Sequence, residues 1–429
     1  MGSKFTFNIR KFYRETLALS AVLKKFNTMT CAILISTLLL PLFRISLNHN
    51  TMRYTLPVLA VLTLAACSKE EDPKSKTAVP STYSFERNGE STVSFNGQIQ
   101  RQAMLSELSN AVKAGTEGTI NYQDLVDMYE NANNPFSDAE LNASGKSLST
   151  KTSASATHVF DQGTSINFFK TILQAAADAS AAGSQASDGV AGVISNGDGS
   201  RKYLVAENGL EYAQILQKGM MGAVFMDQMV NNYLTPLKLN VDNDASAVES
   251  YTAMEHHWDE AYGYFSIVQD YNVDPSVSQS RGYWGGYLLE LEESFNLASD
   301  VYLAFRTGRQ AIVEKNYSVR DAQADIIAEK MEMACYIKAL SYLNKGAARL
   351  NTGEAAVGFH ALSEGVGFIY SLRFIASESV TAAQSDAWIA TLTDGSGFWS
   401  GDIQTRIESV KISIGTTLGL SEDIVNGTY

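Results

Sequence analysis

The residues best suited to chemistry are two histidine–glutamate pairs at helical spacing. His257 lies three residues before Glu260, and His360 lies four residues before Glu364. On a helix, side chains three or four apart share a face, so each pair can act as a unit. Imidazole and carboxylate together suit Fe, Zn or Cu better than Ca or Mg. If the two helices pack side by side, as in the metal sites of helical bundles, these four side chains form a transition-metal site.

The neighbours of the first pair extend the predicted site. His256 and Asp259 are candidates to support the metal ligands from behind. His256 and His257 are about 100° apart on a helix, so they cannot both face one core, and the sequence leaves open which one does. A third helix could add Glu211 or Gln214 to the site.

Two glycines, Gly365 and Gly367, follow the second pair. Each costs about 1 kcal/mol relative to alanine inside a helix, so they predict either a close helix–helix contact or a break between two helices. Arg373 lies nine residues after Glu364, on the opposite face of an unbroken helix. It is therefore a candidate to support the site only if the helix breaks at the glycines.

Simpler interpretations stand beside the metal site. A His–Glu pair at this spacing is often a surface ion pair worth a few tenths of a kcal/mol. Arg306 and Arg309, three apart at a predicted helix end, are expected either to cap that helix or to hold carboxylates or an anion. The sequence contains no His-Glu-x-x-His zinc-peptidase helix, no Gly-x-Ser-x-Gly elbow and no P-loop.

Three functions from different classes remain open, and whether the protein is an enzyme is one of the open questions. The first is a non-enzymatic protein that binds Fe, Zn, Cu or a metal-bearing ligand. The second is a peptidase-like metallohydrolase in which Glu260 is the base for a metal-bound water. The third is a partner- or glycan-binding module without a metal, in which the His–Glu pairs are structural.

Cys67 predicts where the protein is located. It ends the segment Leu64-Ala65-Ala66-Cys67, after a short apolar run that begins near Arg53, which is the pattern of a bacterial lipoprotein signal. Residues 52–66 are then the signal peptide, Cys67 is lipidated, and residues 67–82 form a flexible polar tether. The expected location is the outer membrane, held by the lipid and facing the outside, with a periplasm-facing anchor as the alternative.

Residues 1–51 precede this signal and have two interpretations. They either form an over-extended N-terminus, with translation starting at Met52, or they contain a membrane segment. The uncharged run from Phe26 to Phe43 is 18 residues long and includes a proline, which is marginal for crossing a bilayer.

The net charge excludes one class of partner. Removing residues 1–66 takes away eight basic side chains and one acidic side chain, which changes the formal charge from −13 to −20. We therefore expect no nucleic-acid partner, because phosphate backbones require a basic surface. Cys335 is left without a second cysteine once Cys67 is lipidated, so we expect it to be a small buried hydrophobic residue.

The elements that must position these residues are helices. Apolar residues recur every three to four positions through most of the chain, whereas strand patterns are scarce. Lys202 to Val205 is expected to form a short extended piece, and Ala139 to Ser165 a loop or insertion. We expect an all-α fold of stacked antiparallel helices in one or two bundles, with an N-terminal region over 83–240 and a C-terminal bundle over 241–429.

Several motifs carry a resemblance to known families, all within residues 83–429. Tyr83-Ser84-Phe85, Gly97 to Arg101, Glu255 to Tyr264, and His360 to Gly365 resemble an uncharacterised domain family of Bacteroidota-type lipoproteins. His257-Trp258-Asp259-Glu260 also resembles the His-x-x-Glu of imelysin-type helical bundles, with Glu255 in place of the glycine of that motif. This second resemblance implies an imelysin-like fold, a role in iron uptake with an outer-membrane uptake partner, or peptidase activity.

Overall fold

The computed structural model describes residues 78–245 and 249–429, which belong to one compact unit. The first 51 residues, the predicted signal peptide, Cys67 and most of the tether lie outside the described residues. Within the described ranges, no helix is both long and apolar enough to cross a membrane. Helices dominate, and the described sheets are two small antiparallel hairpins. The predicted all-α fold is confirmed.

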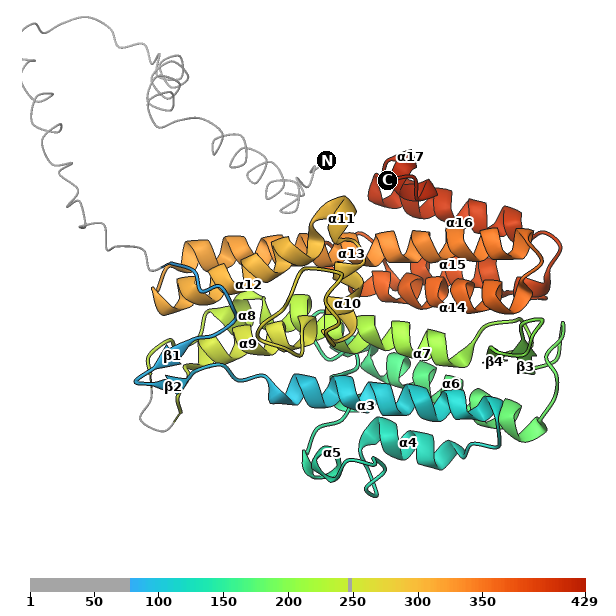
Figure 1. The fold of residues 1–429 in the computed structure, drawn as a ribbon, viewed down its shortest axis with the longest axis horizontal. Coiled ribbons are helices and arrows are strands. Elements are labelled where there is room, and N and C mark those ends of the chain that lie inside the picture. Colours follow the sequence, from blue (N-terminus) through green and yellow to red (C-terminus); the bar gives the residue numbers. More distant parts are fainter. Residues whose placement is uncertain (1–77, 246–248) are drawn as a thin grey trace, which may run out of the picture. The chain divides into compact units, whose positions relative to one another are not determined.

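The first layer of helices follows a short N-terminal hairpin (Figure 1). Asn121 caps α4 by accepting from the backbone of Gln123, and the helix ends at Asn131 in a left-handed conformation that asparagine tolerates. The elements are β1 (Glu86–Arg87), β2 (Glu90–Ser91), α3 (Asn96–Lys113), η1 (Ala114–Thr116), α4 (Tyr122–Glu130), α5 (Ala139–Ala143), η2 (Ser149–Lys151), η3 (Val159–Asp161) and α6 (Gln162–Ala182).

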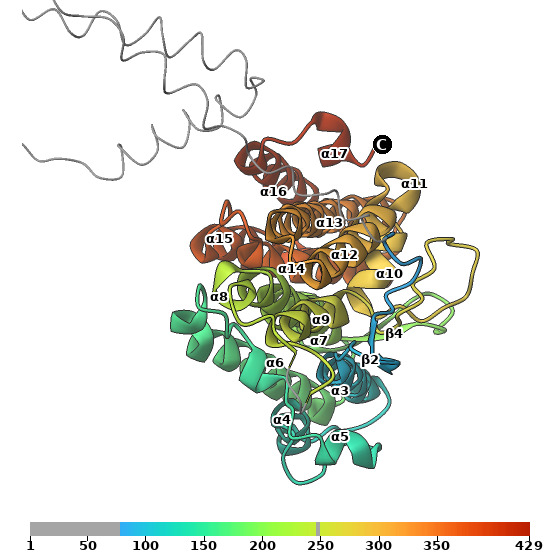
Figure 2. The same cartoon turned by 90° about the vertical axis from the view of Figure 1, so that its left-hand side faces the viewer.

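A middle layer lies between these helices and the C-terminal ones (Figures 1 and 2). The predicted extended piece at Lys202 is β4, which pairs with β3. The layer consists of β3 (Gly192–Ser195), β4 (Lys202–Val205), α7 (Tyr212–Met220), η4 (Met221–Met226), η5 (Met229–Tyr233), α8 (Pro236–Leu239) and α9 (Ala253–Phe265). Of these, η4 and η5 are π-helical, a geometry that is rare and often occurs at functional sites.

The remaining helices stack above the middle layer, with α13 the longest at 35 residues. They are α10 (Tyr283–Leu289), α11 (Glu292–Phe295), α12 (Leu297–Val313), α13 (Tyr317–Asn351), α14 (Ala355–Ser371), η6 (Leu372–Phe374), α15 (Ala382–Thr393), η7 (Gly397–Trp399), α16 (Ile403–Leu418) and α17 (Glu422–Asn426). One hydrophobic core runs through all layers, because α7 packs on α14 and α9 packs on α3 and α12. Both sides of the predicted boundary at residue 240 contribute to this core.

Glycines allow the closest approaches between layers. Helix α14 runs unbroken through Gly365 and Gly367, where an added Cβ would press against Leu343 of α13 and collide with Lys218 of α7. The expectation of a close contact is confirmed, and the alternative of a helix break is wrong. At Gly222 a side chain would collide with Ser371, so the π-helical segment η4 also depends on a glycine to lie against α14.

The Ser/Thr-rich segment before α6 is more ordered than a surface loop. We call residues 147–161 the strap, because they cross the π-helical region and bond to it. Thr152, Ser153 and Ser155 are fully buried, and the backbone N–H of Ser153 donates to the carbonyl of Ala223 in η4. The predicted loop therefore contains α5, η2, η3 and a hydrogen-bonded strap.

Candidate functional site

Helix α9 turns its carboxylates, not its histidines, toward the core. A capping box fixes its start, in which Thr252 accepts from the backbone of Glu255 and Glu255 accepts from that of Thr252. Glu255 and Asp259, four residues apart, are both fully buried. His256 and His257 lie on either side of this face and are partly exposed. The open question of which histidine faces the core is thus answered, because neither does.

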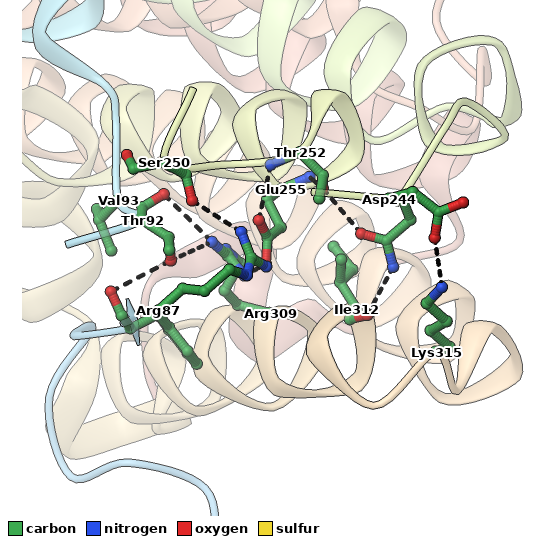
Figure 3. Close-up of polar contacts among 12 residues, drawn as sticks. Arg87, Thr92, Val93, Asp244, Ser250, Thr252, Glu255, Arg309, Ile312 and Lys315 are labelled. Atoms are coloured by element: carbon green, nitrogen blue, oxygen red, sulfur yellow. Dashed lines mark hydrogen bonds and ion pairs between the residues drawn. The ribbon is translucent and has the colours of Figure 1, made fainter. Parts of the chain in front are cut away.

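Arg309 of α12 neutralises this buried face (Figure 3). Its Nη1 donates to Glu255 Oε1 at 2.8 Å and its Nε donates to Asp259 Oδ1 at 3.0 Å. Arg87 of β1 adds a second guanidinium at 2.8 Å from Glu255, and Tyr83 donates to Asp259 at 2.6 Å. Burial opposes ionisation of Glu255, yet Arg309 and the backbone of Thr252 lower its pKa overall.

Two acidic side chains thus meet two guanidiniums. Burial raises the pKa of Asp259, although Arg309 and the hydrogen bond from Tyr83 oppose this shift. We call this group the Arg309 cluster. It joins α9, α12 and the N-terminal hairpin, because Arg309 Nη2 also donates to Thr92 Oγ1 at 2.9 Å. Arg309 lies inside α12 rather than at its end, so the prediction that it holds carboxylates is confirmed and helix capping is wrong for this residue. Asp259, predicted to support a metal ligand, instead belongs to this cluster.

His257 is held in one defined tautomer. Its Nδ1 lies 2.7 Å from the backbone carbonyl of Lys238, which can only accept, so Nδ1 carries the proton. Nε2 then carries the lone pair, and it has no hydrogen-bond partner among residues 78–245 and 249–429. Burial lowers the pKa of His257 below its usual value, which keeps the ring neutral at pH 7. A neutral ring whose other nitrogen is fixed by a carbonyl is the form that binds a metal.

Glu260 lies beside His257 but bonds to other residues. Its Oε1 accepts from Tyr233 Oη at 2.9 Å and from Gln98 Nε2 at 3.1 Å. His256 Nε2 is 3.9 Å from Glu260 Oε2, a weak ion-pair distance, while His256 Nδ1 lies 3.1 Å from the carbonyl of Ser94. His256 and Glu260 therefore share a face of α9, as helical spacing requires. Each of the two histidines is nevertheless oriented mainly by a backbone carbonyl.

Lys151 lies close enough to three other cations and to Glu260 for their charges to affect its ionisation. Lys151 of the strap donates to Tyr233 Oη at 3.2 Å and lies over the Tyr233 ring. Burial lowers the pKa of Lys151, and Arg101, Lys238 and Lys146 lower it further, whereas Glu260 raises it. We call Arg101, Lys146, Lys151 and Lys238 the basic cluster. The chain as a whole has a formal charge of −13, so a cluster with four basic side chains and one acidic side chain differs in sign from the rest of the protein.

Tyr264 provides a further polar group next to the basic cluster. Its ring packs against Tyr233, and its fully buried hydroxyl has no hydrogen-bond partner within normal distance. Burial raises the pKa of Tyr264 to about 12, against the opposing effect of Arg101. Buried hydroxyls are normally paired, so this one is an exception among the described residues, and Arg101 is the charged group that acts on it.

The second predicted pair belongs to a chain of alternating acidic and basic side chains. His360 Nδ1 lies 2.6 Å from Glu211 Oε2, and His360 Nε2 lies 3.7 Å from Glu364 Oε2. Lys218 Nζ in turn lies 3.0 Å from Glu364 Oε1. This order pairs each carboxylate with a basic group and ties α7 to α14. Glu211, proposed as a further ligand, lies next to His360, and Gln214 lines a cavity of about 270 Å³ with both; their role as metal ligands stays a prediction.

The structure does not bring the two predicted pairs together. Helix α9 packs on α3, α12 and η5, whereas α14 packs on α7, α13 and α15. Within the described part of the chain, no group of three or more His, Cys, Asp or Glu side chains is placed to hold a metal ion. Arg373 follows α14 and bonds Ser385 and Asp386, not the predicted ligands. A bare ion held by His257, Glu260, His360 and Glu364 therefore does not fit this arrangement.

Sequence reasoning missed a third histidine site, on the strap. His158 Nδ1 lies 2.7 Å from Asp227 Oδ1, and Ser155 donates to the same carboxylate through its hydroxyl at 2.6 Å and its backbone N–H at 2.9 Å. Asp227 lies between η4 and η5 and is fully buried. The two partners are 69 residues apart, so no helical spacing joins them. The only feature of the sequence that could have drawn attention to His158 was the scarcity of histidine.

The chain belongs to a family described as a domain of unknown function, DUF4856, which matches residues 80–421. The match confirms the expectation of an uncharacterised domain family that covers nearly all of the chain after the tether. No curated protein matches the chain, and no solved structure matches it either. The resemblances to imelysin-type proteins and to Bacteroidota-type lipoproteins stay predictions.

Proposed function

We propose that the protein is a lipid-anchored binding protein of the outer membrane whose ligand is an anionic, metal-bearing molecule. The observation that carries the proposal is the position of His257, a neutral histidine with a free Nε2, beside the basic cluster. The lipobox that ends at Cys67 supports the anchor and the location. A ligand of this kind is consistent with iron acquisition, the role that the imelysin-type resemblance implies.

The basic cluster favours an anion over a bare cation. A free metal ion near Glu260 would meet the positive charges of Lys151, Arg101 and Lys238, which oppose its binding. A chelate that carries carboxylates would be attracted by the same charges and could form charge-assisted hydrogen bonds with them. Such a ligand also supplies most of the metal's coordination sphere, so the protein needs to contribute only one or two donor atoms.

His257 is suited to be that donor. Its Nδ1–H is held by the carbonyl of Lys238, an arrangement that orients the ring and raises the basicity of Nε2 toward a metal. The ammonium groups of Lys151 and Lys238 would supply hydrogen bonds to oxygen atoms of the ligand. His257 and the basic cluster together therefore offer one group for a metal and several for an anionic frame.

The test is metal retention by the purified full chain. The protein would be loaded with ferric citrate, with haemin, or with free Zn²⁺, and the metal that remains after gel filtration would be measured by elemental mass spectrometry. We expect one of the two anionic iron chelates to be retained in stoichiometric amount, with Lys151→Met and His257→Ala both losing it.

Lys170→Met is the matched control, because Lys170 forms an ion pair with Glu130 away from the basic cluster and should retain the chelate. Retention of free Zn²⁺ without either chelate would contradict the proposal and favour a protein-ligated ion. If the protein retained none of the three metal sources, a metal-free binding module would remain. If the protein hydrolysed members of a peptide panel and Glu260→Gln abolished this activity, the peptidase alternative would be favoured.

A further inference from the structure

A cavity of about 520 Å³ lies beside the strap, separate from the residues assigned above to chelate binding. Its volume is in the range of small-molecule sites. Its walls come from the strap, the start of α6, the end of α14 with η6, and the start of α15. The lining residues that carry the argument are His158, Asp161, Phe168, Tyr370, Glu378 and Asp386.

His158 borders this cavity in a fixed orientation. The contact with Asp227 at 2.7 Å places the proton on Nδ1, since the buried carboxylate accepts from its other neighbours as well. In the neutral ring, Nε2 carries a lone pair on the side away from Asp227, and His158 lines the cavity. The His158 and Phe374 rings are in T-shaped contact, with their centroids 5.0 Å apart, which limits the rotation of His158.

The remaining charges of the lining are mostly negative. Arg373 is already committed, because it donates to Asp386 at 2.6 Å and lies 4.0 Å over the Tyr370 ring. Asp161 and Glu378 have no ion-pair partner in the described part of the chain. Two carboxylates without an ion-pair partner and a histidine therefore border a space whose walls also include the rings of Phe168, Tyr370 and Phe374.

We propose that this cavity binds a small organic cation, with an ammonium group held by Asp161, Glu378 and His158 Nε2 and an apolar body packed against Phe168 and Phe374. Aromatic rings attract cations through their faces, and carboxylates accept the ammonium hydrogens, so both parts of the lining favour the same ligand. This site is independent of chelate binding, which involves other residues.

Matched pairs of opposite charge test the proposal on the purified full chain. Tyramine and 4-hydroxyphenylacetate share a ring and differ in the charge of the side chain, as do tryptamine and indole-3-acetate. Isothermal titration calorimetry at millimolar concentrations should detect at least one amine and should show it binding more tightly than its carboxylate partner. The double variant Asp161→Asn/Glu378→Gln should weaken the amine about tenfold, because two partly exposed ion pairs are lost.

Two further variants separate binding from folding. Asp178→Asn/Glu140→Gln removes two exposed carboxylates outside the cavity and should leave amine binding unchanged. His158→Gln should reduce the ratio of amine to carboxylate affinity, a quantity that a general loss of folded protein does not alter. Equal or tighter binding of the carboxylates, no binding of either amine, or insensitivity to the Asp161/Glu378 double variant would overturn the proposal.

Discussion

The Arg309 cluster and the Asp227–His158 pair both bury carboxylates completely, but they neutralise them differently. In the first, two arginines face Glu255 and Asp259, so every charge has a fixed opposite. In the second, Asp227 has neutral donors from Ser155 and one histidine that borders a cavity. A fully matched cluster fastens helices together, whereas a carboxylate that relies on a histidine orients a group that remains available to a ligand.

The largest effect expected from this comparison is on stability. Arg309→Met would leave Glu255 and Asp259 buried with only Arg87 and neutral donors nearby. Breaking a buried ion pair by removing one partner costs about 3–5 kcal/mol. Urea unfolding followed by circular dichroism should show a loss of this size, whereas Arg306→Met, on the same helix, should cost less than about 1 kcal/mol. A loss below that of Arg306→Met would mean that the cluster does not fasten α9 to α12.

The Asp227–His158 pair should contribute less to stability and more to ligand binding. Asp227→Asn removes the charge that Ser155 and His158 share, and hydrogen bonds to charged groups are worth about 1.5–3 kcal/mol. We expect a loss of unfolding free energy in that range together with weaker amine binding. Asp178→Asn, an exposed carboxylate on α6, should change stability by less than about 0.5 kcal/mol. A stable Asp227→Asn protein with unchanged amine affinity would refute the orienting role.

The basic cluster should behave in the opposite way to the Arg309 cluster. Lys151→Met removes one of several like charges, so we expect stability to change by less than about 0.5 kcal/mol or to increase. Chelate retention should nevertheless be lost. The comparison is made by running the urea titration and the metal measurement on the same preparation. A marked loss of stability would indicate that Lys151 is structural.

The smallest effect concerns pH. The pKa of His257 in the folded chain lies below its ordinary value of 6.5 because the ring is buried. Just below pH 6.5, the unfolded chain therefore binds more protons than the folded chain does. The contribution of His257 to stability is complete above about pH 6.5, and it is lost as the pH falls toward the pKa of the folded chain. The midpoint of urea unfolding between pH 7 and 5 should fall less steeply in His257→Gln. An identical slope would contradict the buried, neutral assignment.

The sequence predicted the fold better than it predicted the site. Helical periodicity and the scarcity of strand patterns led to an all-α fold, and both the close approach at Gly367 and the extended piece at Lys202 are seen. The same periodicity cannot distinguish α-helix from π-helix, so the placement of Asp227 between η4 and η5 was invisible. Long-range pairs such as Arg309 with Glu255 have no local spacing to reveal them.

The prediction for α9 was half correct for a physical reason. Helical spacing predicted a histidine–glutamate pair on this helix, and the histidine within ion-pair distance of Glu260 is His256; the spacing could not tell which face is buried. The prediction placed a histidine on the buried face because histidine is a common metal ligand. The buried positions are instead those of Glu255 and Asp259. Their arginine partners on α12 and β1 compensate the cost of removing these side chains from water. A buried carboxylate is tolerated only with such partners, and these become apparent only in the folded chain.

A haemin titration of the purified protein, followed by visible absorption, tests whether His257 binds the metal of an anionic chelate. Ligation of the iron by an imidazole shifts the main absorption band, so the spectrum reports on His257 itself. We predict a saturable shift in the wild-type protein that is lost in His257→Ala and kept in His256→Ala. A shift that persists in His257→Ala, or a wild-type spectrum that matches free haemin at every protein concentration while ferric citrate is not retained either, would contradict the account.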